Sequence, residues 1–168
     1  MKMTLILLGL GLGIIGLIVV IGYLLPVSHM ASRSIELKAP IGQVWSTVSD
    51  FKRSPDWRGD LKSVEQIEHQ PGVFAWKEIA KNDDVLIYLT LEATPEKKLV
   101  RKIINDGLPF GGAWIFEMDS DNGATRLTIT ENGEVYNPIF RFVSRFIFGH
   151  YASMDKYLAQ LKRHFGEE

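Results

Sequence analysis

The sequence has no cysteine, and this absence excludes disulfide bonds, thiolate catalysis and thiolate metal sites. It has no basic surplus either, because its 19 Lys and Arg residues are balanced by 20 Asp and Glu residues. Without a basic run or a basic excess, we expect no nucleic-acid partner. The four histidines lack the spacing of metal ligands, so we expect no metal site and no other cofactor; they are His29, His69, His150 and His164.

Charged residues are also absent between Lys2 and Arg33. Residues 4–25 are apolar or small apart from Thr4 and Tyr23. As a helix this run is about 33 Å long, which is enough to cross a hydrocarbon core of about 30 Å. We therefore predict that residues 4–25 anchor the protein in a lipid bilayer. Gly9 and Gly13 form a G-x-x-x-G pair, a spacing that would allow a weak homodimer through close helix packing.

The stretch "GLGIIG" (11–16) has two competing interpretations. It matches G-x-G-x-x-G, and Glu36 follows Gly16 at the distance of a ribose-binding acid. A cofactor-binding crossover helix needs one polar face, however, and this segment has none, which favours the membrane span. A cleaved signal is the other alternative. We favour an uncleaved anchor, because the apolar core exceeds the usual ~7–15 residues and no small-residue cleavage site follows it.

The remaining chain is long enough for one domain. We expect an anchor and linker over residues 1–31, with "SHMAS" (28–32) as part of the linker, and one folded domain over residues 32–168. Alternating or β-branched runs bounded by turn residues predict seven strands. They cover residues 32–39, 61–68, 73–80, 85–93, 99–106, 113–118 and 125–136. Short connections between the last six favour an antiparallel sheet.

Helical spacing of apolar residues predicts two larger helices. The first covers "PIGQVWSTVSDF" (40–51), followed by a short helix or turn in "KRSPDWRGD" (52–60). The second begins at Asn137 and Pro138, a good N-cap and first-turn pair, and continues for about 28 residues to Phe165. Gly149 near its middle can bend it. This long helix has the apolar stripe needed to cover one face of the curved sheet.

The segment "IELKAPIGQVWSTVSDFKRSPDWRGDLKSVE" (35–65) contains "APIGQVW" and "DFKRSPDW", and together with the order of elements it resembles the opening of the START-like superfamily of polyketide cyclases and dehydrases. The segment from "GLPFGG" into the last helix resembles membrane-anchored bacterial members. The resemblance covers residues 32–165. It implies an α+β helix-grip fold, with about seven antiparallel strands around a long C-terminal helix. It also implies a cavity for a lipid, an isoprenoid or a polyketide-like molecule.

Alternation places two rows of side chains on the inward face of the last strands. Trp114 and Phe116 share one face of 113–118, and Ile129 and Glu131 share one face of 125–136. A buried carboxylate needs a partner or a raised pKa, which makes Glu131 a candidate site residue. The interpretation that we favour is simpler: "ENG" (131–133) forms a bulge or strand end and leaves Glu131 in water.

Five residues are predicted to contact a ligand. Phe110 lies in the glycine-rich segment "GLPFGG", which either gates a pocket or is a tight connection. Trp76 either lines a cavity or belongs to the core. The full set is Trp76, Phe110, Trp114, Phe116 and His150.

Three residues are weak candidates for acid–base chemistry: Glu131, His150 and Arg101. His150 lies on the apolar stripe of the last helix. It acts either as an acid or base, or as a structural residue with one satisfied hydrogen bond. Arg101 and Lys102 fall on opposite faces of one strand, and we assign the inward position, facing an anionic head group, to Arg101.

We expect a membrane-tethered binding or carrier protein for an apolar small molecule. The alternative is a cyclase- or dehydrase-type enzyme with acid and base groups in the same cavity. A third interpretation is an interaction domain whose groove receives a partner segment. The resemblance places the protein in the bacterial cell membrane. The short N-terminal tail with Lys2 favours a folded domain outside the cytoplasm.

Overall fold

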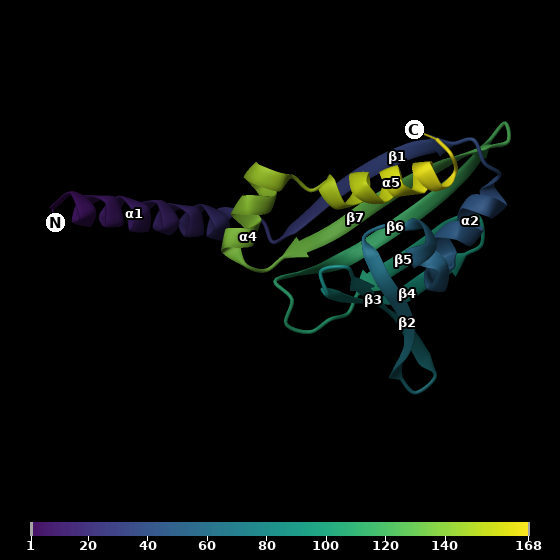
Figure 1. Ribbon diagram of the computed structural model, residues 1–168, viewed down its shortest axis with the longest axis horizontal. Coiled ribbons are helices and arrows are strands. Elements are labelled where there is room, and N and C mark those ends of the chain that lie inside the picture. Colours follow the sequence, from purple (N-terminus) through teal and green to yellow (C-terminus); the bar gives the residue numbers. More distant parts are fainter. Residues whose placement is uncertain (1, 168) are drawn as a thin grey trace.

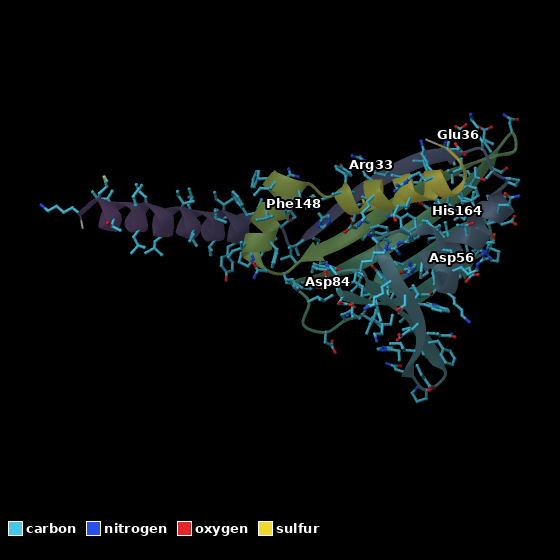
Figure 2. All side chains as sticks on the ribbon, viewed as in Figure 1. Arg33, Glu36, Asp56, Asp84, Phe148 and His164 are labelled. Carbon is cyan, nitrogen blue, oxygen red and sulfur yellow. The ribbon has the colours of Figure 1, made fainter. Side chains whose placement is uncertain are left out.

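The computed structural model of the chain describes residues 2–167, and it combines a long N-terminal helix with one antiparallel sheet and several shorter helices (Figure 1). Helix α1 (Lys2–Leu24) runs without interruption through "GLGIIG", so this segment is not a dinucleotide-binding loop. Its side chains project outward along its length, away from the sheet (Figure 2). Among the described residues, α1 is the one helix long and apolar enough to cross a membrane, and a signal sequence would share these properties.

Seven strands form one sheet in the order β1-β7-β6-β5-β4-β3-β2, and all neighbouring strands are antiparallel. Consecutive strands make every pairing except β1–β7, which joins the two ends of the chain. The predicted α+β class and antiparallel sheet are confirmed. The strands are β1 (Ser28–Leu37), β2 (Leu61–Gln70), β3 (Val73–Ala80), β4 (Val85–Thr94), β5 (Lys98–Ile103), β6 (Phe110–Asp121) and β7 (Ala124–Val135).

The inward face of β6 and β7 is the one that alternation predicts. Phe116 lies opposite Ile129, Trp114 lies opposite Glu131, and the pairing continues past Glu131 without a bulge. Phe116 and Ile129 are fully buried. The expectation of a bulge or strand end at "ENG" is therefore wrong, because both β1 and β6 pair with this part of β7 and hold it extended.

The first strand begins earlier than expected. Residues 28–31 were expected to be linker, but they form the start of β1, where Ser28 pairs with Glu134 and Ala31 with Glu131. Backbone pairing with β7 is the physical reason, since it satisfies polar groups that a linker would leave to water. Only Leu25–Val27 separates α1 from the sheet. The outer limits of the two expected domains, residues 1 and 168, lie outside the described residues.

Three short helices close one end of the sheet (Figure 1). They are α2 (Ile41–Ser49), η1 (Phe51–Arg53) and α3 (Ser54–Trp57), as the sequence predicted for a helix followed by a short helix or turn. In α2, Val44 and Val48 share a face and are almost completely buried against the core. Together these helices leave the opposite end of the sheet open.

The C-terminal segment is not one long helix. It consists of α4 (Pro138–Val143), the π-helix η2 (Ser144–Phe148) and α5 (Ala152–His164). Gly149 adopts φ 72° and ψ 172°, which is outside the helical region and accessible mainly to glycine. The break divides the apolar stripe between two surfaces. Met154 and Leu161 of α5 are fully buried on the sheet, whereas Phe146 and Ile147 of η2 are 60% and 64% exposed.

Helix α4 packs against the end of α1 instead of against the sheet. A Cβ atom at Gly22 would overlap the backbone carbonyl of Pro138, so glycine is needed for this close approach. The Arg141 guanidinium donates hydrogen bonds to the carbonyls of Leu25 (2.9 Å) and Tyr136 (3.2 Å). The Asn137 side chain caps α4 by accepting from the backbone N–H groups that follow it. These contacts fix α4 across the end of α1.

The variant Gly22→Val is expected to separate α4 from α1, because the added side chain cannot fit against Pro138. Trypsin cleaves after Arg141 and Arg145, so we expect several-fold faster cleavage at these two sites in the detergent-solubilised chain. Mass spectrometry of the fragments gives the rates. Gly16→Val is the matched control, since a Cβ there meets no atom within 4 Å. Equal cleavage of the two variants would contradict the packing of α4 on α1.

Candidate functional site

Aromatic side chains fill the space between α5 and the middle of the sheet, where we expected a cavity. The Tyr157 ring lies 5.2 Å from Trp57, 5.7 Å from Trp114 and 5.6 Å from Phe116, measured between ring centroids. Such distances are those of packed aromatic pairs. These rings, which come from α3, β6 and α5, therefore fill the space at this position. A separate hollow of about 530 Å³ is lined by Lys156 of α5 and by Leu61, Glu78 and Leu86 of the sheet.

A groove is found instead at the open end of the sheet, beside the helix break. Its volume is about 430 Å³, within the range of small-molecule sites. One wall comes from β7, the start of β6 and β1, and the other comes from α4, η2 and the start of α5. The lining includes His29, Phe110, Glu131, Phe140, Phe148 and His150.

A second hollow of about 480 Å³ lies on the other side of the same histidines. It is lined by the Leu25–Ala31 segment and by Arg141, Arg145 and Tyr151. His29 and His150 line both hollows. Their rings stack with centroids 3.8 Å apart and planes 21° apart. The stacked imidazoles therefore form a partition between the groove and this second hollow.

Glu131 completes a small ionisable cluster in the groove. Its Oε1 lies 3.7 Å from Nε2 of His29, and its side chain is 20% exposed. Its Oε2 is buried and has no hydrogen-bond partner among the described residues. A buried acceptor of this kind gains energy from any ligand that donates a hydrogen bond to it.

The electrostatics of the cluster favour neutral groups. Burial raises the pKa of Glu131, and the neighbouring Trp114 side chain only partly opposes the rise. Burial, followed by the charge of His150, lowers the pKa of His29. Burial, followed by the charge of Arg145, lowers the pKa of His150. At neutral pH the two imidazoles are therefore uncharged, so each ring offers one donor and one acceptor nitrogen.

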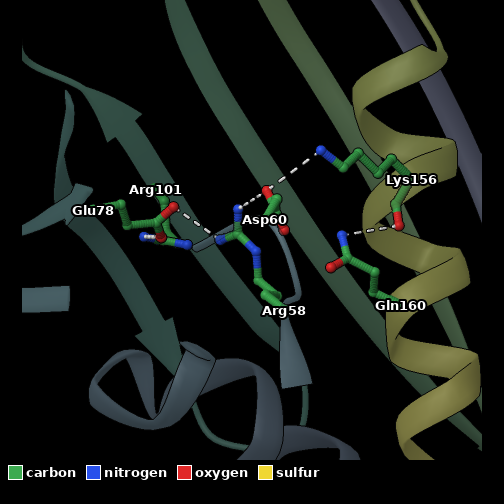
Figure 3. Close-up of polar contacts among 6 residues, drawn as sticks. All are labelled: Arg58, Asp60, Glu78, Arg101, Lys156 and Gln160. Atoms are coloured by element: carbon green, nitrogen blue, oxygen red, sulfur yellow. Dashed lines mark hydrogen bonds and ion pairs between the residues drawn. The ribbon is translucent and has the colours of Figure 1, made fainter. Parts of the chain in front are cut away.

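A second polar cluster joins the connection between α3 and β2 to β3, β5 and α5 (Figure 3). Arg101 donates to Glu78 Oε1 at 2.6 Å, and Arg58 donates to Glu78 Oε2 at 2.8 Å. Arg58 also donates to Asp60 at 3.2 Å, and Lys156 of α5 lies 3.9 Å from the same Asp60 oxygen. Glu78 is 3% exposed. At the centre of the cluster, the two carboxylates balance the charge of the two guanidinium groups.

The pKa of Glu78 reflects this pairing. Burial alone would raise it, but the positive charges of Arg101 and Arg58 outweigh burial and hold the pKa below its usual value. The Arg101 guanidinium lies between the rings of Phe51 (4.2 Å) and Tyr88 (4.3 Å). Arg101 does point inward as expected. Its guanidinium is already paired, however, so this cluster supports the fold of the domain rather than a free anion site.

The predicted site residues therefore separate into two groups. Glu131, His150 and Phe110 meet in the groove, with Trp114 opposite Glu131 on β6. Arg101, Trp76 and Phe116 lie elsewhere: Arg101 pairs with Glu78, Trp76 packs on Phe51 at 5.3 Å, and Phe116 is buried. Ligand contact by any of them stays a prediction.

His29 and the Arg58–Glu78 pair are the residues that sequence reasoning missed. A signal for His29 was present, because the alternation of β1 extends back from Leu37 through Ile35, Arg33 and Ala31 to His29. Treating "SHMAS" as linker hid it. No comparable signal exists for Arg58, which follows a short helix and reaches Glu78 only through the tertiary fold.

The variant Glu78→Gln is expected to lower the free energy of unfolding by about 3–5 kcal/mol, because it leaves two buried guanidinium groups without their carboxylate. Urea unfolding of the detergent-solubilised chain measures the change. Glu65→Gln is the control, since the Glu65–Lys77 pair is 52% and 32% exposed and we expect a loss of at most about 1 kcal/mol.

The pH dependence of the Glu78 contribution to the free energy of unfolding follows from the lowered pKa of Glu78. The stabilisation is present above the unfolded pKa of 4.5 and is lost as the pH falls through the folded value. Equal losses in the two variants, or an unchanged acid sensitivity in Glu78→Gln, would contradict the assignment.

Comparison with known proteins identifies the family. Residues 28–166 match the family described as "Polyketide cyclase / dehydrase and lipid transport". No curated protein matches the chain.

Several solved structures share the fold. A START superfamily protein from Mycobacterium smegmatis is 16% identical with a TM-score of 0.62, over 82% of this chain and 97% of that one. Norcoclaurine synthase from Thalictrum flavum is 13% identical with a TM-score of 0.64, over 84% of this chain and 88% of that one. The di-domain ARO/CYC StfQ from the steffimycin biosynthetic pathway is 9% identical with a TM-score of 0.62, over 80% of this chain and 49% of that one. At these identities the structures show the fold alone. The matched segment spans most of the chain, and the protein belongs to the polyketide cyclase / dehydrase and lipid transport family.

Proposed function

We propose that this protein is a membrane-tethered binding or carrier protein for an apolar small molecule, such as a lipid, an isoprenoid or a polyketide-like compound. The observation that supports it is the groove of about 430 Å³ at the end of the domain from which α1 emerges. Phe110, Val135, Phe140, Val143 and Phe148 give it apolar walls. Burial of an apolar ligand there is favourable by about 0.8 kcal/mol per CH₂ group relative to water.

The position of the groove fits a ligand that resides in a membrane. Helix α4 lines the groove and also packs against α1 through Pro138 and Gly22. If α1 spans the bilayer, the groove lies close to the bilayer surface, where apolar molecules are concentrated. A ligand could then transfer between membrane and protein without crossing bulk water.

Polar groups are needed for selectivity, because a ligand that leaves a bilayer gains little hydrophobic energy. Glu131, His29 and His150 are ionisable groups that line the groove. The Glu131 carboxyl oxygens can accept from a hydroxyl group, and a neutral imidazole can donate to a carbonyl oxygen or accept from a hydroxyl group. We therefore infer that the ligand has a polar end, with a hydroxyl or carbonyl group, directed at this cluster.

One observation favours the alternative of a cyclase- or dehydrase-type enzyme. Glu131, His29 and His150 together supply a carboxyl group and two neutral imidazoles in one groove. Aldol cyclisation and dehydration need a base to remove a proton beside a carbonyl and an acid to protonate oxygen. Arg101 would take no part, because two strand spacings, about 10 Å, separate its strand from that of Glu131.

The binding proposal predicts covalent labelling of the groove by a diazirine-bearing fatty acid. After irradiation of the full chain in lipid nanodiscs, we expect labelled peptides from 109–111, 131–135 and 140–153. The variant Ala152→Trp should remove most of this label, because residue 152 lines the groove and an indole would fill it. Peptide mass spectrometry measures the label at each segment.

The matched control is Ala159→Trp, which adds the same side chain at an exposed position of the same helix. It should leave the labelling unchanged. Label confined to α1, or an equal loss in both variants, would count against ligand binding in the groove.

The electrostatics of the cluster predict that His29 and His150 titrate below the ordinary histidine pKa of 6.5. Nitrogen-detected NMR of the imidazoles measures both midpoints. The variant Arg145→Gln should raise the pKa of His150 toward 6.5, because it removes a nearby positive charge, while the larger effect of burial remains. The control Arg163→Gln, an exposed change in α5, should have no effect.

The lowered pKa values of the two histidines determine how the stability of the fold changes with pH. Folding favours neutral histidines, so the stability is complete above pH 6.5 and is lost as the pH falls through the folded pKa values. Titration of either ring above 6.5 would show that the cluster is charged at neutral pH, against both interpretations of the groove.

A further inference from the structure

Large apolar side chains are exposed together on α4 and η2. We call this surface the α4–η2 face and define it as Ile139, Phe140, Phe146, Ile147 and Phe148, which are 44%, 52%, 60%, 64% and 72% exposed. Scattered exposed apolar residues are ordinary, but a continuous group of this size marks an interaction surface. Phe146 contacts Phe142, with ring centroids 5.0 Å apart, and still keeps most of its surface exposed.

The face continues the apolar surface of α1. Helix α4 contacts the end of α1 through Gly22, and Arg141 bonds to the carbonyl of Leu25 directly after α1. Figure 1 shows α4 and η2 at the level where α1 ends, and Figure 2 labels Phe148 there. A bilayer that contained α1 would therefore reach the α4–η2 face at its interfacial level.

The charges around the face also fit a lipid interface. Residues 135–154 contain two arginines, Arg141 and Arg145, and no acidic residue. Arg145 is exposed and can reach phosphate groups while its neighbours contact acyl chains. Arg141 is buried, and its guanidinium is bonded to the carbonyls of Leu25 and Tyr136. Tyr23 and Tyr136, which are 67% and 50% exposed near the end of α1, are of the residue type enriched in interfacial aromatic belts.

We propose that the α4–η2 face lies in the head-group and acyl boundary of the bilayer that holds α1, as an interfacial segment. Interfacial helices bury their apolar side in this layer and keep basic groups at the phosphates. Phe140 and Phe148 belong to the face and also line the groove, so the groove opens toward the acyl chains. This proposal rests on the membrane tether of the proposed function and adds the second contact that orients the domain.

The absence of cysteine allows a clean test, because one introduced cysteine gives one label. The variants Ile147→Cys and Phe148→Cys place an environment-sensitive nitrobenzoxadiazole label on the α4–η2 face of the full chain. Phe74→Cys is the matched control, since Phe74 is also a large exposed apolar residue (53%) but belongs to β3, in the hairpin far from α1 in Figure 1. The labelled chains are reconstituted in nanodiscs of phosphatidylcholine and phosphatidylglycerol.

Lipids that carry a nitroxide on the acyl chain should quench the labels at 147 and 148 several-fold more than the label at 74. Quenchers on the lipid head group should act less strongly at 147 and 148 than acyl-chain quenchers do. Quenching at these positions no greater than at position 74 would overturn the proposal. If the labels at 147 and 148 report an apolar environment only in discs with two copies of the chain, the proposal is also overturned. The face would then be assigned to a second copy.

Residue 147 does not line the groove, so quenching of its label reports bilayer contact and separates this measurement from the test of the proposed function. Lipid contact at 147 and 148 with no labelling of the groove would retain the interfacial segment and reject the carrier. Groove labelling with no lipid contact at these positions would retain the carrier and reject the interfacial segment. The double variant Phe146→Ser and Ile147→Ser, at exposed positions that do not line the groove, should also lower the rate of groove labelling while leaving α1 in the membrane.

Discussion

The pairing of β1 with β7 is the constraint on which the rest of the structure depends. It joins ten residue pairs, from Ser28 opposite Glu134 to Leu37 opposite Thr125. Through this pairing the end of α1 meets the start of α4, although more than 100 residues separate them in the chain. It also places His29 opposite Gly133, where a Cβ would overlap the imidazole ring. Both the contact between α1 and α4 and the ionisable cluster follow from this one register.

The sheet has two ends with different physical character. At one end α2 and α5 cover it, aromatic rings fill the interior, and Glu78 is held by two guanidinium groups. At the other end α4 and η2 lie beside α1, and the chain returns to the sheet only after Gly149, where α5 begins. The groove exists because of this arrangement, since an unbroken helix would have continued its apolar stripe over the same end. The groove therefore lies at the end of the sheet beside α1.

Much of the fold could be predicted from local patterns. The strands from 61 to 136 agree with the structure to within a few residues, because alternation and turn residues act over short distances. The inward rows with Phe116 and Ile129 were predicted for the same reason. The site was predicted less well. Phe110, Glu131 and His150 meet in the groove, but His29 lay in an expected linker and Arg101 is neutralised by Glu78.

The sequence by itself determined the apolar helix, the antiparallel sheet and the identity of most inward-facing residues, since hydrophobic periodicity and turn chemistry are properties of neighbouring residues. Gly149 was predicted as a possible bend, and the tertiary structure decided that the last helix breaks there completely. The tertiary structure alone decided that α4 joins α1 at Gly22 and that two histidines stack beside Glu131. These features depend on contacts between residues far apart in the chain. Their energies arise only when the two ends of the sequence are brought together, and no local pattern records them.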